Sequence, residues 1–275
     1  MCCPRRWCFA LVALAVCHAW IATPALAIVL GTFDSSRVGD ANLINGAFTT
    51  QARSSFAVHF PQVTLSGISS LTPATLSGLD ALLIFNTSGV STTTGLAPSE
   101  QSALLNFVTS GKSAFVMADG FGLTTAQTFL APFTMQESSN PVIDTGSTIN
   151  FANAITTGPY GLVTSYTESH GGVFNLLGSA APLIDAGNIA QPTFASIERN
   201  VLSSGSGRVA VTTDTTAFAD PGVGGFFSTN ETLFLNTVQW ILPVPEPTAI
   251  VMAGMGAAAL VIVCRRKGSC RMKRS

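Results

Sequence analysis

Short apolar runs alternate with more polar segments along the first half of the chain. Residues 27–34 have the pattern of a buried first strand. Ala81–Phe85 is a continuous apolar run, which is typical of a parallel strand covered on both faces. A polar segment expected to be helical follows the first run to about Ala57, and a second extended stretch is expected over Val58–Ile68. The order strand, helix, strand, strand begins an α/β pattern.

The clearest predicted helix begins at Pro98 and ends before Gly111, since proline favours a first helical turn and glycine a C-cap. Strands are expected directly afterwards over Ser113–Ala118 and much later over Gly207–Asp214, with a last helix from about Asn230. This alternation predicts an α/β domain with a doubly wound, mostly parallel sheet.

The pattern loosens between Pro132 and Ser206, where Ser, Thr, Gly and Asn are abundant. Its short apolar pieces, such as Val173–Leu177, predict antiparallel strands and loops that extend the sheet.

The N-terminus has the three parts of a secretory signal peptide over residues 1–27. Arg5 and Arg6 supply the positive charge, and Phe9–Ile21 is the apolar stretch. Ala25 and Ala27 form a small-x-small cleavage site. We therefore expect an N-terminal signal helix, handled by the Sec machinery and signal peptidase, and a mature domain over 28–242.

The C-terminus, residues 243–275, has a different order of features. Pro245, Glu246 and Pro247 precede an apolar run over 248–264, and a basic end follows over 265–275. The run predicts a C-terminal transmembrane helix of about 26 Å, close to the thickness of a bilayer core. The basic end should stay cytoplasmic, which places the domain on the periplasmic side.

This order resembles the PEP-CTERM sorting signal of Gram-negative bacteria. The resemblance implies that an exosortase recognises the tail near Pro245-Glu246-Pro247. It also implies an inner-membrane intermediate, and then delivery to the cell surface or the extracellular matrix, often beside exopolysaccharide. An ordinary single-pass anchor with a proline-rich stalk is the alternative.

Charge and cysteine content exclude several functions for residues 28–242. This segment holds five basic and 13 acidic side chains, so it lacks the basic surface that nucleic-acid binding requires. All six cysteines lie in the two terminal segments. The domain therefore has no cysteine nucleophile and no thiolate metal site.

A series of six elements resembles the class I glutamine-amidotransferase-like superfamily, in its non-catalytic branches. The elements are Ala81–Asn86, Pro98–Gly111, Lys112–Gly120, Ile155–Pro159, Gly207–Asp214 and Asn230–Leu242. The resemblance implies a flavodoxin-like sheet. Its catalytic members carry a cysteine at the turn after the fourth strand, where this chain has Asp119. The glutaminase activity is therefore not carried over, and no catalytic residue is assigned.

Four polar residues are expected just beyond the carboxyl ends of strands, where open α/β sheets bind ligands. They are Asp34, Asn86, Asp119 and Asp214. Three interpretations stay open. The carboxylates could hold Ca²⁺ or Mg²⁺, although no cofactor is predicted, or they could bind a sugar-like ligand. Alternatively, each residue caps a helix or closes a turn.

Two functions are compatible with these features. The first is an exported surface or matrix protein whose α/β domain is a non-catalytic binding or structural module, with exopolysaccharide as a candidate partner. The second is a carboxylate- or metal-dependent hydrolase of envelope sugars, using Asp119 and Asp214. The missing nucleophile favours the first.

The sorting interpretation makes a direct prediction about Glu246. The variant Glu246→Ala should keep its tail, because the exosortase recognition sequence is lost. Immunoblotting of the protein in its host measures the processed fraction, with a substitution in the basic end as control. Removal of the tail from Glu246→Ala at the normal rate would contradict the interpretation.

Overall fold

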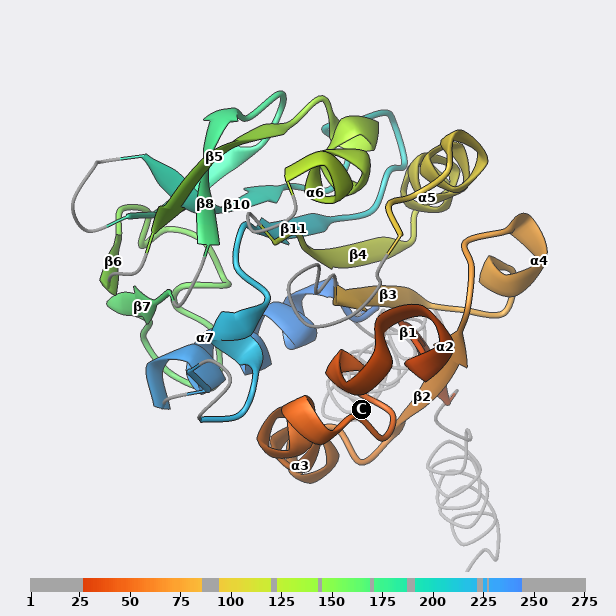
Figure 1. The fold of residues 1–275 in the computed structure, drawn as a ribbon, viewed down its shortest axis with the longest axis horizontal. Helices are drawn as coiled ribbons and strands as arrows, with labels where there is room; N and C mark the ends of the chain where they lie inside the picture. The colour runs from red at the N-terminus through yellow and green to blue at the C-terminus, as the bar shows by residue number, and fades with distance from the viewer. Residues whose placement is uncertain are drawn as a thin grey trace, which may run out of the picture.

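The chain folds into one large mixed sheet with helices on both faces (Figure 1). The computed structural model of the protein describes residues 27–85, 94–119, 123–142, 145–168, 171–186, 191–221, 225–226 and 228–243. The predicted α/β class is confirmed within these residues.

Parallel strands form one half of the sheet, in the order β2-β1-β3-β4-β11. They are β1 (Ile28–Phe33), β2 (Val63–Ile68), β3 (Ala81–Phe85), β4 (Ser113–Met117) and β11 (Val209–Thr212). Every residue of β3, β4 and β11 is buried. Continuous apolar strands of this kind require cover on both faces of the sheet.

Antiparallel strands continue the sheet beyond β11, in the order β10-β9-β6-β7. They are β6 (Thr145–Thr148), β7 (Ser165–Thr167), β9 (Ala181–Asp185) and β10 (Pro192–Ile197). Strands β5 (Gln136–Val142) and β8 (Gly171–Leu176) form a separate two-stranded sheet, drawn above β10 in Figure 1. The predicted antiparallel extension is confirmed, with this small second sheet as an addition.

The helices divide between the two faces of the sheet. They are α2 (Ser35–Val38), α3 (Thr50–His59), α4 (Pro73–Leu76), α5 (Pro98–Thr109), α6 (Leu123–Leu130) and α7 (Ser228–Ile241), with short 3-10 turns η1 (Gly39–Ala41), η2 (Ala47–Thr49), η4 (Ala131–Phe133) and η5 (Thr216–Phe218). Buried side chains of α3 and α7 share one apolar cluster, and those of α2, α4, α5 and α6 share another. The sheet is therefore covered on both sides, as expected of a doubly wound arrangement.

One element boundary predicted from the sequence is wrong. The stretch expected to be extended from Val58 begins instead as the last turn of α3, which runs to His59. Strand β2 starts only at Val63. Both Val58 and His59 are exposed, so no core contact forces these residues into the sheet.

Both predicted terminal helices lie outside the described residues, which end at residue 243. Within the described part of the chain, no helix is both long enough and apolar enough to cross a membrane.

A buried ion pair joins α2 to the start of α5. Arg37 Nη2 donates to Glu100 Oε2 over 2.9 Å, and the two side chains are 13% and 10% exposed. The backbone N–H groups of Leu71 and Ala97 also donate to this carboxylate. Burial opposes ionisation of Glu100, but the bonds from Arg37, Leu71 and Ala97 outweigh it and lower its pKa.

Removing this carboxylate should destabilise the domain strongly. We expect Glu100→Ala to cost about 3–5 kcal/mol in urea unfolding of the full chain, because it leaves the Arg37 charge buried without its partner. Lys112→Ala, which removes a more exposed ion pair with Asp80, is the matched control and should cost about 1 kcal/mol or less. Equal losses of unfolding free energy in the two variants would show that the Arg37–Glu100 pair stabilises the fold no more than an exposed ion pair does.

Candidate functional site

Two aspartates lie side by side at the carboxyl edge of the sheet. Strands β4 and β11 are parallel neighbours, and Met117 pairs with Thr212 at their ends. Asp119 and Asp214 each follow two residues later and are 2% and 0% exposed. The matched register therefore brings both aspartates to the same level of the sheet edge.

A third carboxyl group reaches them from the small sheet. Glu137 lies in β5 and is 2% exposed. Burial, and then the charges of Asp119 and Asp214, raise the pKa of Glu137 to about 8. No described residue donates a hydrogen bond to either of its carboxyl oxygens. Glu137 is therefore protonated at neutral pH, beside two aspartates.

Strand β7 adds a tyrosine and a fourth carboxyl group. Tyr166 is fully buried, and its hydroxyl lies 3.0 Å from Thr212 Oγ1 and donates to the Asp214 carbonyl over 3.2 Å. Burial, and then the charges of Asp214 and Glu168, raise the pKa of Tyr166 well above its usual range. Glu168 is 2% exposed. We call Asp119, Glu137, Glu168 and Asp214 the carboxyl-edge cluster.

Local hydrogen bonds fix Asp214 in this position. Its Oδ1 accepts from Thr216 Oγ1 over 2.5 Å and from the Ala217 N–H over 3.2 Å, and both donors belong to the 3-10 turn η5. Strand β8 passes close by: a Cβ atom on Gly171 would lie only 2.8 Å from the Asp214 Cβ. Glycine is therefore required where the small sheet crosses the end of β11.

The other two predicted site residues are not part of this group. Asp34 is the N-cap of α2, where its Oδ1 accepts from the Ser36 N–H over 2.9 Å. That is the capping role left open by the sequence, and Asp34 is not among the charges that raise the Glu137 pKa. Asn86 lies outside the described residues.

Sequence reasoning did not place Glu137 or Glu168 in this site. Glu137 belongs to a polar strand with no apolar alternation, so no periodicity indicates which way its side chain points. Glu168 follows a strand of three residues. Only the chain path of the antiparallel region brings these groups to the ends of β4 and β11.

Among the described residues, no three His, Cys, Asp or Glu side chains are grouped so that they could hold a metal ion. A protonated Glu137 beside Asp119 and Asp214 is instead a carboxyl group kept neutral by its surroundings. Binding of Ca²⁺ or Mg²⁺ stays a prediction.

Residues 243–267 match the PEP-CTERM protein-sorting motif. The chain carries a PEP-CTERM sorting motif. The match supports an exported protein that an exosortase sorts to the cell surface. No curated protein matches the sequence significantly.

The fold is similar to that of solved structures, at low sequence identity. The N-terminal domain of mmIFT52 is similar, with a TM-score of 0.57 at 13% identity, over 79% of this chain and 98% of that one. An exo-beta-1,4-mannosidase from an Opitutaceae bacterium has a TM-score of 0.48 at 13% identity, over 84% and 39% of the two chains. A glutamine amidotransferase from Thermotoga maritima has a TM-score of 0.40 at 8% identity, over 70% and 76%. The amidotransferase likeness is therefore distant, and the non-catalytic branch stays a prediction.

The stability of this protein should depend on pH through Glu137. Its pKa rises from 4.5 to about 8 on folding, so the folded state holds a proton that the unfolded state has released. Stability from this group is complete below pH 4.5 and falls until about pH 8. Between these two pH values the free energy of unfolding should fall by about 5 kcal/mol.

Glu137→Gln should remove this dependence, because glutamine does not titrate. The difference in unfolding free energy between Glu137→Gln and the unsubstituted chain should grow with pH by several kcal/mol between pH 4.5 and 8. Urea unfolding at a series of pH values measures it, with exposed Asp40→Asn as control. Parallel pH profiles for the Glu137 variant and the unsubstituted chain would show that Glu137 is not buried as described.

Proposed function

We propose that this protein is an exported, exosortase-sorted component of the cell surface or extracellular matrix, whose α/β domain is a non-catalytic binding or structural module. The PEP-CTERM motif over 243–267 supports the sorting step. In this proposal the chain passes through the inner membrane with its domain on the periplasmic side. A predicted helix over 248–264 holds it there until the tail is removed.

One observation carries the non-catalytic part of the proposal. All four members of the carboxyl-edge cluster are 2% exposed or less. A catalytic acid or base must come within about 3 Å of the proton that it transfers, directly or through one water. Buried carboxyls do not reach a polysaccharide chain unless the elements above them move.

The turn after β4 also supports a non-catalytic role. Catalytic members of the superfamily that the sequence resembles carry a cysteine at this turn, and the chain has Asp119 there instead. Asp119 is 2% exposed. The Asp214 carboxylate already accepts hydrogen bonds from Thr216 and Ala217 of η5. These contacts support a structural role for the cluster, in closing the small sheet over the parallel strands.

A hydrolase of envelope sugars is the second candidate, and a specific observation favours it. Glu137 is protonated at neutral pH beside Asp119 and Asp214. A neutral carboxyl group next to carboxylates is the pairing that glycoside hydrolases use as acid and base. This function requires an opening that exposes Glu137.

The two functions predict different results with exopolysaccharide from the host. The protein in its processed form, recovered from the host, should co-sediment with the polysaccharide and release no reducing sugar. Asp119→Asn and Glu137→Gln should both retain binding, because neither group contacts the ligand. If the protein releases reducing sugar and both variants abolish that release, the domain is a hydrolase and not a non-catalytic module. If the protein does not co-sediment, exopolysaccharide is not its partner, and the domain has a structural role only.

A further inference from the structure

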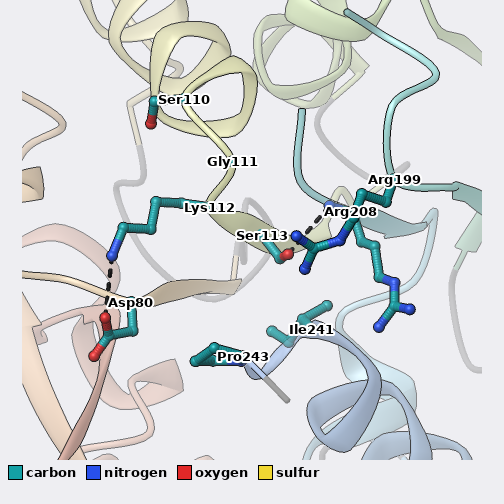
Figure 2. A pocket seen from close by; sticks show the side chains of 9 residues that line it. All are labelled: Asp80, Ser110, Gly111, Lys112, Ser113, Arg199, Arg208, Ile241 and Pro243. Atoms are coloured by element: carbon teal, nitrogen blue, oxygen red, sulfur yellow. Dashed lines mark hydrogen bonds and ion pairs between the residues drawn. The ribbon is translucent and has the colours of Figure 1, made fainter. Parts of the chain in front are cut away.

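The amino edge of the sheet, opposite the carboxyl-edge cluster, contains a cavity of about 470 Å³. It lies where the chain enters β4 and β11, beside the end of α7. Figure 2 shows Lys112 directed toward Asp80 on one side of the cavity, and Arg199 and Arg208 on the other. Pro243, at the end of the described chain, also lines it. We call this the amino-edge cavity.

The cavity gathers most of the positive charge of an acidic domain. Residues 28–242 contain 13 acidic and only five basic side chains. Three of the five line the cavity, together with a single carboxylate, Asp80. The two other arginines are engaged elsewhere, Arg37 with Glu100 and Arg53 with the Gly46 carbonyl.

The two arginines at the cavity are only partly satisfied by the protein. Arg208 Nη1 donates to the Trp240 carbonyl over 2.9 Å, and the guanidinium lies 5.2 Å from the Trp240 ring centre. Its Nε has no hydrogen-bond partner, and the nearest carboxylate, Glu198, is 4.0 Å away. Arg199 is exposed and forms no ion pair with any residue that the structure describes.

The like charges of these arginines act on each other. Burial lowers the pKa of Arg208, and the charge of Arg199 lowers it further, against the opposite effect of Glu198. Arg199 and Arg208 therefore repel each other, although the carboxylate of Glu198 acts on Arg208 more strongly and with the opposite sign. A bound oxyanion would relieve the repulsion and provide a hydrogen-bond acceptor for the fork geometry of arginine.

Nearby helix ends explain only one of these cations, because Arg208 donates to the Trp240 carbonyl in the last turn of α7. Cations often gather at the C-terminus of a helix to meet its unpaired carbonyls. At the end of α5, however, the Asn106 carbonyl accepts from the Ser110 N–H, and the Phe107 carbonyl accepts from the Ser110 hydroxyl. The Val108 carbonyl accepts from the N–H groups of Gly111 and Gly207. These carbonyls are satisfied without a basic side chain.

The position of Pro243 links the cavity to the membrane. The sorting motif begins at this residue, and the apolar run starts five residues later, at Thr248. An extended chain of that length spans at most about 17 Å. Before the tail is removed, an inserted run would therefore hold the cavity within reach of the phosphate groups of the bilayer surface.

We propose that the amino-edge cavity binds a phosphate group, with Arg199 and Arg208 as its principal ligands and Lys112 as a further source of positive charge. A volume of about 470 Å³ exceeds what free phosphate fills and admits a phosphodiester with its substituents. The phosphate is supplied either by a lipid headgroup or by a soluble compound. The cavity lies at the sheet edge opposite the carboxyl-edge cluster, and only the lipid source of the phosphate rests on the membrane intermediate of the proposed function.

Binding to the full chain in a neutral detergent tests this site. Isothermal titration at constant ionic strength uses three probes: inorganic phosphate, short-chain phosphatidylglycerol, and short-chain diacylglycerol, which lacks phosphate. The first two should bind and compete, and diacylglycerol should not. Phosphatidylglycerol binding identifies a lipid site, and phosphate binding without it identifies a soluble ligand.

Three variants distinguish the cavity from unspecific charge effects. Arg199→Glu should weaken phosphate binding about tenfold or more, and Arg199→Lys should weaken it less. Arg199 is exposed, so both variants should fold. Arg53→Glu, which makes the same reversal of charge at a residue that does not line the cavity, should leave binding unchanged. No binding of either phosphate probe, or equal binding by Arg199→Glu and the unsubstituted chain, would overturn the proposal.

Discussion

The burial of three neighbouring parallel strands constrains the rest of this structure. Every residue of β3, β4 and β11 is buried, because helices cover both faces of the sheet. Ionisable side chains are therefore confined to the positions where these strands begin and end. Since the strands are parallel, all their starts lie at one edge and all their ends at the other.

The two edges carry opposite charges as a result. Lys112 and Arg208 precede β4 and β11 at one edge, and Asp119 and Asp214 follow the same strands at the other. The antiparallel region then closes the acidic edge with Glu137 and Glu168, whereas the basic edge retains a cavity next to Pro243. One edge is thus part of the interior, and the other is accessible to ligands beside the sorting tail.

The sequence predicts the central elements well because their signals are local. The run Ala81–Phe85 matches β3 residue for residue, and Pro98 starts α5. The expectation that residues following parallel strands lie at the carboxyl edge of the sheet also placed Asp119 and Asp214 there. Asp34, by contrast, has the local role of capping α2. The position of Glu137 in the carboxyl-edge cluster was not predictable, because it depends on the packing of segments that are distant in the sequence. Register and chain path in such polar strands depend on packing that no local pattern records.

The account depends most directly on the closed, protonated state of Glu137. Carbon-13 NMR of the glutamate carboxyls, with Glu137→Gln to assign the resonance, follows this group as pH is raised. A titration midpoint near 8, well above the ordinary 4.5, is the predicted result and indicates a carboxyl buried beside Asp119 and Asp214. A midpoint near 4.5 would show that Glu137 is open to solvent, and would contradict the description of the acidic edge as interior.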